Sequence, residues 1–281
     1  MVRNLAVLCL LSGFSSAGPI LYLTNSQNQL LTIDAATPGS VTTVGAITGL
    51  QGGESIFGID FRPATGQLYG LGSTSRLYTI NTATATATQV GSAGAFTLSG
   101  TSFGFDFNPT VDRIRVTSNA GQNLRLNPND GTLTSTDTAL NGATTTAMGS
   151  AYTNSFSGAV TTSLYALDAN SDALYLSSNP NGGTYGLVGS LGINSLANVG
   201  FDIAFPGNVG WAALSVVPGT SQLYTIDLGT GAATLVGSIG SEQTITGLAV
   251  TPGAVPEPST VLITLTGLGL IGASWRRRTT L

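Results

Sequence analysis

Three aspartates recur at one position of a repeated apolar segment. They are Asp60, Asp106 and Asp202, and each follows a glycine by two residues. If the segments are equivalent strands around one axis, the carboxylates form an acidic ring that could hold Ca²⁺ through oxygen ligands or supply a general acid and base. In the structural alternative, each carboxylate accepts hydrogen bonds from backbone N–H groups of a neighbouring repeat. We favour this alternative, because repeated polar residues often link neighbouring repeats. Ala151 and Ala249 take the equivalent position in two other copies, so any ring is incomplete.

Two arginines, Arg115 and Arg125, stand where most other repeats carry an aromatic residue. On adjacent strands they would lie side by side, where like charges are destabilising. One interpretation is a contact with an anion or an acidic sugar. The other, the commoner use of a half-buried arginine, is pairing with a carboxylate such as Asp106 or Asp112.

The composition excludes many chemistries. The chain has no histidine and no lysine, which removes histidine bases, histidine-liganded metals, Schiff bases and the phosphate-loop lysine. Its one cysteine, Cys9, lies in the predicted leader, so thiol catalysis is absent from the mature body. Residues 18–254 contain five arginines against twelve acidic residues, a formal charge of −7. Nucleic acid is therefore not an expected partner.

The elements that must position these residues recur with a period of 45 to 51 residues. The first strand of each period begins with glycine: 58–63, 104–109, 149–154, 200–205 and 247–252. Three further short strands follow the first four copies, with turn residues between them. Four strands per period are typical of a propeller blade.

The final copy, 247–252, supplies only a first strand, and the segments 21–24, 30–33 and 41–44 supply the missing three. The sequence thus predicts an all-β, five-bladed β-propeller with its fifth blade shared between the termini, which would hide open strand edges. The alternative is an open or six-bladed ring, with an irregular extra unit in the loop 155–163.

A short polar side chain closes the third strand of each blade, and we interpret all five as turn residues, because a short acceptor caps a turn. They are Asp34, Asn81, Asn127, Asp168 and Asp227.

Both ends of the chain carry predicted membrane-targeting segments. Residues 1–17 have the basic start, apolar run and small-residue end of a signal peptide, with cleavage predicted after Ala17. Residues 255–281 form a tail in which Pro256, Glu257 and Pro258 precede an apolar run, 261–275, that predicts a transmembrane helix. The basic end, Arg276, Arg277 and Arg278, should stay cytoplasmic and place the body, 18–254, outside.

This tail resembles the PEP-CTERM sorting signal of exported proteins of Gram-negative bacteria. The resemblance implies a membrane sorting protease or transpeptidase as a partner, a membrane-anchored precursor, and a final location at the cell surface or outside the cell.

The body resembles an exported family catalogued as domain of unknown function 4394. The resemblance is carried by Gly58–Pro63 running into Leu68 and Tyr69, by Gly104–Pro109, and by Asn123–Pro128. It supports the fold and implies no chemistry.

Two functional hypotheses remain. The sequence favours a non-catalytic surface or matrix protein, with extracellular polysaccharide as a candidate partner. The alternative is a carboxylate- or Ca²⁺-dependent hydrolase or lyase that uses the propeller channel. The sequence favours a protein without a cofactor, with Ca²⁺ as the candidate that remains open.

Overall fold

The computed structural model describes residues 18–197, 199–240 and 244–252. The predicted signal peptide with its cleavage site after Ala17 lies outside these residues, as does the tail with its sorting motif and apolar run 261–275. The described residues form strands and turns, and none of them forms a helix of the length and apolarity needed to cross a membrane.

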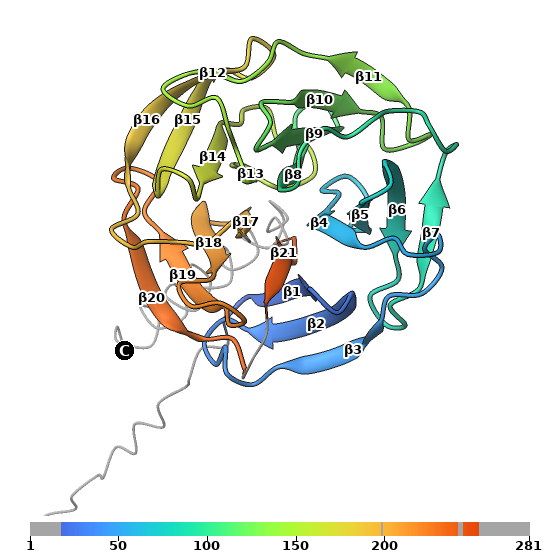
Figure 1. Cartoon of the computed structure of the whole chain (residues 1–281), viewed down its shortest axis with the longest axis horizontal. Coiled ribbons are helices and arrows are strands. Elements are labelled where there is room, and N and C mark those ends of the chain that lie inside the picture. Colours follow the sequence, from blue (N-terminus) through green and yellow to red (C-terminus); the bar gives the residue numbers. More distant parts are fainter. Residues whose placement is uncertain (1–17, 198, 241–243, 253–281) are drawn as a thin grey trace, which may run out of the picture.

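Five sheets surround a central axis, and each sheet forms one blade (Figure 1). Blade 1 consists of β21 (Ile245–Val250), β1 (Ile20–Asn25), β2 (Gln29–Asp34) and β3 (Thr42–Ala46). Blade 2 consists of β4 (Ile56–Phe61), β5 (Leu68–Gly72), β6 (Arg76–Ile80) and β7 (Ala87–Val90). Blade 3 consists of β8 (Phe103–Asn108), β9 (Arg113–Ser118), β10 (Asn123–Leu126) and β11 (Leu133–Thr136).

The other two blades complete the ring. Blade 4 consists of β13 (Gly149–Tyr152), β14 (Leu164–Asp168), β15 (Ala173–Asn179), β16 (Thr184–Ser190) and the short β12 (Asn141–Gly142). Blade 5 consists of β17 (Val199–Ala204), β18 (Val209–Leu214), β19 (Gln222–Ile226) and β20 (Ala233–Ser238). The five-bladed propeller predicted from the repeat is confirmed.

Blade 1 closes the ring by joining the two ends of the described chain. Strand β21 pairs antiparallel with β1, with Leu21 opposite Val250 and Leu23 opposite Leu248. The Thr251 N–H adds a bond of 3.2 Å to the Ile20 carbonyl. The predicted shared blade is therefore present, and it pairs an inner strand edge that would otherwise be open.

The six-bladed alternative is wrong for the described residues. The loop 155–163 connects β13 to β14 within blade 4 and contains no strand. Strand β12, which pairs in parallel with the edge of β16 outside the four strands of the repeat, was not predicted. Its two residues have no apolar alternation that could have marked it.

Buried apolar side chains form five clusters. Four of them combine side chains of two neighbouring blades, as where Leu21 and Leu23 of blade 1 pack with Ala213 and Leu223 of blade 5. The fifth, between blades 3 and 4, draws only on blade 4 and the loop before it. Blade 3 presents polar side chains on that face, so this interface differs from the other four.

The turn residues behave as predicted. The side-chain oxygen of each accepts a hydrogen bond from the backbone N–H two residues later, at distances of 2.8 to 3.1 Å. These are Asx-type turns, in which a short side chain replaces a backbone acceptor. The prediction is confirmed for Asp34, Asn81, Asn127, Asp168 and Asp227.

A ring of glycines brings the inner strands close together. A Cβ atom at any of them would come within 2.8 Å of another atom, whereas packed carbon atoms lie about 3.5–4.0 Å apart. The ring glycines are Gly58, Gly104, Gly149, Gly200 and Gly247. They leave an axial space of about 10 Å³, roughly what one water molecule needs.

Candidate functional site

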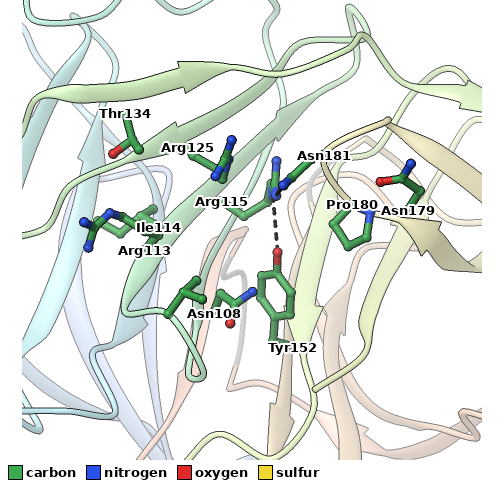
Figure 2. Close-up of a pocket in the computed structure, with 11 residues that line it drawn as sticks. Asn108, Arg113, Ile114, Arg115, Arg125, Thr134, Tyr152, Asn179, Pro180 and Asn181 are labelled. Atoms are coloured by element: carbon green, nitrogen blue, oxygen red, sulfur yellow. Dashed lines mark hydrogen bonds between the residues drawn. The ribbon is translucent and has the colours of Figure 1, made fainter. Parts of the chain in front are cut away.

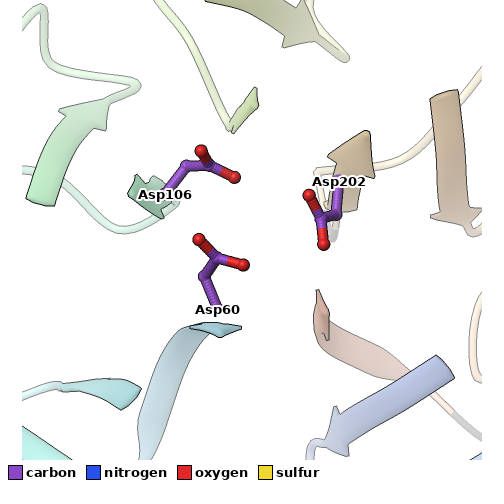
Figure 3. A group of neighbouring side chains, drawn as sticks. All are labelled: Asp60, Asp106 and Asp202. Atoms are coloured by element: carbon purple, nitrogen blue, oxygen red, sulfur yellow. The ribbon is translucent and has the colours of Figure 1, made fainter. Parts of the chain in front are cut away.

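The three repeated aspartates converge beside the axis (Figure 3). Asp60 lies on β4, Asp106 on β8 and Asp202 on β17, each two residues after a ring glycine and therefore on the same face of its strand. One carboxylate oxygen from each lies within 4.8 Å of the other two. The three aspartates at equivalent positions of the repeat therefore form one cluster.

Each aspartate also bonds to the next blade. The Asp60 carboxylate accepts the Phe107 N–H at 2.8 Å, which links blades 2 and 3. The Asp106 carboxylate accepts the Tyr152 N–H at 3.0 Å, and the Asp202 carboxylate accepts the Val250 N–H at 2.6 Å. These are the inter-blade bonds of the structural alternative, and the last one reaches the strand that closes the ring.

The cluster is dry. Asp60 and Asp106 are 2% exposed and Asp202 is 3% exposed. Burial, followed by repulsion from the neighbouring aspartates, raises the pKa values of Asp60 and Asp106 well above the ordinary range. Burial raises the pKa of Asp202 to about 6. Ionising all three together is unfavourable, so the cluster favours shared protons or a cation.

We expect the protein to become more stable as the pH falls from about 8 to about 4. A carboxyl group with a raised pKa contributes stability that is fully present below its unfolded pKa and is lost as the pH rises through its folded pKa. For Asp202 this window runs from 3.8 to about 6, which corresponds to about 3 kcal/mol. Thermal unfolding across this range measures it, at roughly 2–4 °C of Tm per kcal/mol.

Two asparagine variants separate charge from hydrogen bonding. Only Oδ1 of Asp106 accepts a described N–H group, so Asp106→Asn keeps the bond to Tyr152 and removes a charge. It should raise Tm at pH 8 and flatten the pH dependence. Both oxygens of Asp202 accept N–H groups, so Asp202→Asn places an amide N–H₂ against a donor and should not show this gain. A lower Tm for Asp106→Asn at pH 8 would contradict the repulsion argument.

The two predicted arginines lie side by side, Arg115 on β9 opposite Arg125 on β10. Asp137 lies between them: its Oδ2 accepts Nη1 of Arg115 at 2.6 Å and Nε of Arg125 at 2.7 Å, and its Oδ1 accepts Nη2 of Arg125 at 2.9 Å. This shared carboxylate offsets the repulsion between the two cations.

The carboxylates suggested from the sequence were wrong. The Asp106 carboxylate instead accepts a hydrogen bond from the backbone N–H of Tyr152. Asp112 forms an ion pair with Arg62. Asp137 follows β11, in the chain segment that leads away from blade 3, and nothing in its spacing from Arg115 marked it as the partner.

A pocket of about 430 Å³ lies between blades 3 and 4, and Arg115 and Arg125 are among its lining residues (Figure 2). Its lining residues come from both blades: Asn108, Val111, Arg113, Ile114, Arg115, Arg125, Thr134, Tyr152, Asn179, Pro180 and Asn181. Arg113 was not among the residues predicted from the sequence. Its signal was available, since Arg113 and Arg115 are two residues apart on one strand and so share a face.

Residues 29–249 match a family model described as domain of unknown function (DUF4394). The chain belongs to this family. Residues 254–278 of the DUF4394 chain match the PEP-CTERM protein-sorting motif, which includes Pro256, Glu257, Pro258 and the three terminal arginines. The motif implies export and recognition by a membrane sorting system.

Two solved structures show the same fold as the DUF4394 propeller. A chain of a nidogen/laminin complex is 10% identical with a TM-score of 0.50, and the match covers 83% of this chain and 98% of that one. A structural genomics protein of unknown function from Bacteroides thetaiotaomicron is 13% identical with a TM-score of 0.50, covering 85% and 68%. No curated protein matches the sequence.

Proposed function

We propose that this protein is an exported, non-catalytic binding propeller of the cell surface or extracellular matrix. The observation that carries the proposal is that the channel carboxylates are committed to inter-blade hydrogen bonds and are almost inaccessible. The axial space of about 10 Å³ beside the ring glycines is too small for a substrate. The missing histidine and lysine point the same way.

The sorting motif supports the location. In this proposal the precursor is held by its C-terminal segment and processed near Pro256–Pro258, and the body is then released or attached at the cell surface. A membrane sorting protease or transpeptidase is the partner for that step, and extracellular polysaccharide is the proposed partner of the mature body.

A second candidate function rests on the aspartate cluster. Two ligand oxygens bound to one Ca²⁺ at about 2.3–2.6 Å lie at most roughly 5 Å apart, which the spacing within 4.8 Å allows. Ca²⁺ takes six to eight oxygen ligands, whereas five of the six oxygens of these three carboxylates already accept backbone N–H groups. It therefore fits the ion only in part, and a Ca²⁺-dependent hydrolase or lyase is the weaker candidate.

One experiment on secreted protein tests both functions. Mass spectrometry of protein from the extracellular fraction should show a mature form without Arg276–Arg278. That form should be retained on polysaccharide from the same source, and millimolar Ca²⁺ should leave its Tm unchanged. Retention of the three arginines would contradict processing. A Ca²⁺-dependent rise in Tm that Asp106→Ala abolishes, together with turnover of an ester, lactone or glycan, would favour the enzyme.

A further inference from the structure

Arginines gather in one place on this acidic protein. Residues 18–254 contain five arginines, and three of them, Arg113, Arg115 and Arg125, line the pocket between blades 3 and 4. This is also the interface whose apolar cluster receives nothing from blade 3. At this interface blade 3 therefore presents arginines where the other blades present apolar side chains. Apolar packing does not account for three arginines at this place.

Arg115 is the most buried of the three arginines, and each of its three guanidinium nitrogens donates at least one hydrogen bond within the protein. Its side chain is 2% exposed. Its Nε donates to the Tyr152 hydroxyl, Nη1 to Asn123 and Asp137, and Nη2 to Asn181. A ligand that entered the pocket would thus meet the other two arginines first.

Arg113 and Arg125 keep free donors. Arg113 uses Nη1 on the Asp112 carbonyl, and its Nε and Nη2 donate to no other described residue. Arg125 uses Nε and Nη2 on Asp137, which leaves Nη1, and its side chain is 29% exposed. The free Nε and Nη2 of Arg113 form the edge of a guanidinium that pairs with a planar carboxylate through two hydrogen bonds.

The amides of the pocket extend this donor set. The side-chain oxygens of Asn108, Asn179 and Asn181 already accept hydrogen bonds, while their Nδ2 groups donate to no other described residue. The unoccupied polar groups that these side chains contribute are therefore donors. A ligand rich in acceptors, such as a carboxylated sugar with its hydroxyl and ring oxygens, complements them.

The local charge stays positive. Asp137 is shared by Arg115 and Arg125, so three cations face one paired carboxylate. Two other acids lie near Arg113. The carboxylate of Asp112, its neighbour in the chain, is paired with Arg62, and the pKa of Asp130 is lowered by hydrogen bonds from Thr132 and, to a smaller extent, by the charge of Arg113. Among the described residues, no carboxylate lies within the 4.0 Å of an ion pair with Arg113.

We propose that this pocket binds the carboxylate of an acidic sugar in an extracellular polysaccharide, with Arg113 and Arg125 as the contacting cations. The volume of about 430 Å³ lies in the usual range of roughly 300–1,000 Å³ for small-ligand sites. Val111 and Pro180 add apolar surface for the C–H groups of a sugar ring. The inference rests on the proposed binding function and names its ligand class and its site.

Calorimetric titration with two uronic-acid polymers, polygalacturonate and alginate, tests the proposal. At least one should bind, and binding should weaken with added salt because the contacting charges are partly exposed. Arg113→Gln should weaken the affinity about 10-fold, since a hydrogen bond to a charged group is worth about 1.5 kcal/mol or more. Arg125→Gln should weaken it as well, and Arg76→Gln, an equal charge change in blade 2, should leave it unchanged.

Methyl-esterified polygalacturonate separates the carboxylate from the rest of the polymer, and it should bind at least 10-fold more weakly. Equal binding of the ester, equal binding by Arg113→Gln, or no binding of either uronic-acid polymer would overturn the inference. If polysaccharide from the source is still retained in those cases, the proposed function stands and only the site or ligand is wrong. If nothing is retained, the binding function falls too.

Discussion

A protein without residues 18–45 should lose cooperative unfolding and aggregate. This deletion removes β1, β2 and all of β3 except Ala46. The edge of β21 then loses its partner, and Leu223 and Leu248 lose the side chains packed on them. An unpaired apolar strand edge recruits other chains. Circular dichroism during heating, with light scattering for association, measures both effects. A deletion variant as soluble and as cooperative as the parent would refute closure by the shared blade.

A circular permutant is the matched control, because it keeps every strand. Joining residue 252 to residue 18 through a short linker is feasible, since the Thr251 N–H and the Ile20 carbonyl lie 3.2 Å apart. New termini between Gly52 and Gly53 fall in an exposed turn where a Cβ would meet nothing within 4 Å. The permutant should unfold cooperatively, near the Tm of the parent. If it also aggregates, the deletion result reflects sensitivity to new chain ends and not the loss of closure.

Asp137→Asn should be among the most destabilising single substitutions, by about 3 kcal/mol. The Asp137 side chain is 4% exposed and its charge faces Arg115, which is 2% exposed. Burial opposes the ionised form of Asp137, yet hydrogen bonds from the two arginines, with Ser135, outweigh burial and lower its pKa. Without that charge, two neighbouring guanidinium groups repel each other in a partly dry site.

The comparison is Asp112→Asn, at the other arginine–aspartate pair. The Asp112 side chain is 33% exposed, and exposed ion pairs contribute about 0–1 kcal/mol. Asparagine also tolerates the positive φ of 51° at this position. Urea unfolding of both variants should show a clearly larger loss for Asp137→Asn. Equal losses would mean that burial does not set the strength of the Asp137 contact.

The low pKa of Asp137 also sets the acid limit of stability. A group with a lowered pKa contributes stability that is present above its unfolded pKa and lost as the pH falls through its folded pKa. This is the opposite sense to the channel aspartates, so the stability maximum should lie in mildly acidic solution, between the two sets of titrations.

The architecture could be predicted from the sequence because the same strand pattern recurs in every blade. The glycine near the start of each inner strand and the apolar alternation that follows it recur in every blade. One correct interpretation of this pattern therefore located all five blades and placed Asp60 and Asp202 at equivalent positions. The split of blade 1 followed from counting, since one copy had an inner strand only.

The pocket could not be reached in the same way, because it consists of departures from the repeat. Asp137 and Asn181 come from connecting segments whose paths no periodicity describes, and both contact Arg115. The pairing of Arg115 with Asp137 rather than Asp106 depends on where the loop after β11 runs. The strand alternation could have placed Arg113 on the same face as Arg115. That its Nε and Nη2 are free could not be predicted, because this depends on the positions of the surrounding carboxylates in the folded protein.

The ring glycines bear on how this protein family could change its blade number. Duplicating one blade would lengthen the innermost circumference by one strand, and the inner radius would grow with it. The space that now has room for a single water molecule would become a water-filled passage, and Asp60, Asp106 and Asp202, two residues after their ring glycines, would become exposed to solvent. Their pKa values would then return toward those of ordinary aspartates. In this lineage, blade number and the protonation state of the axis are therefore expected to evolve together.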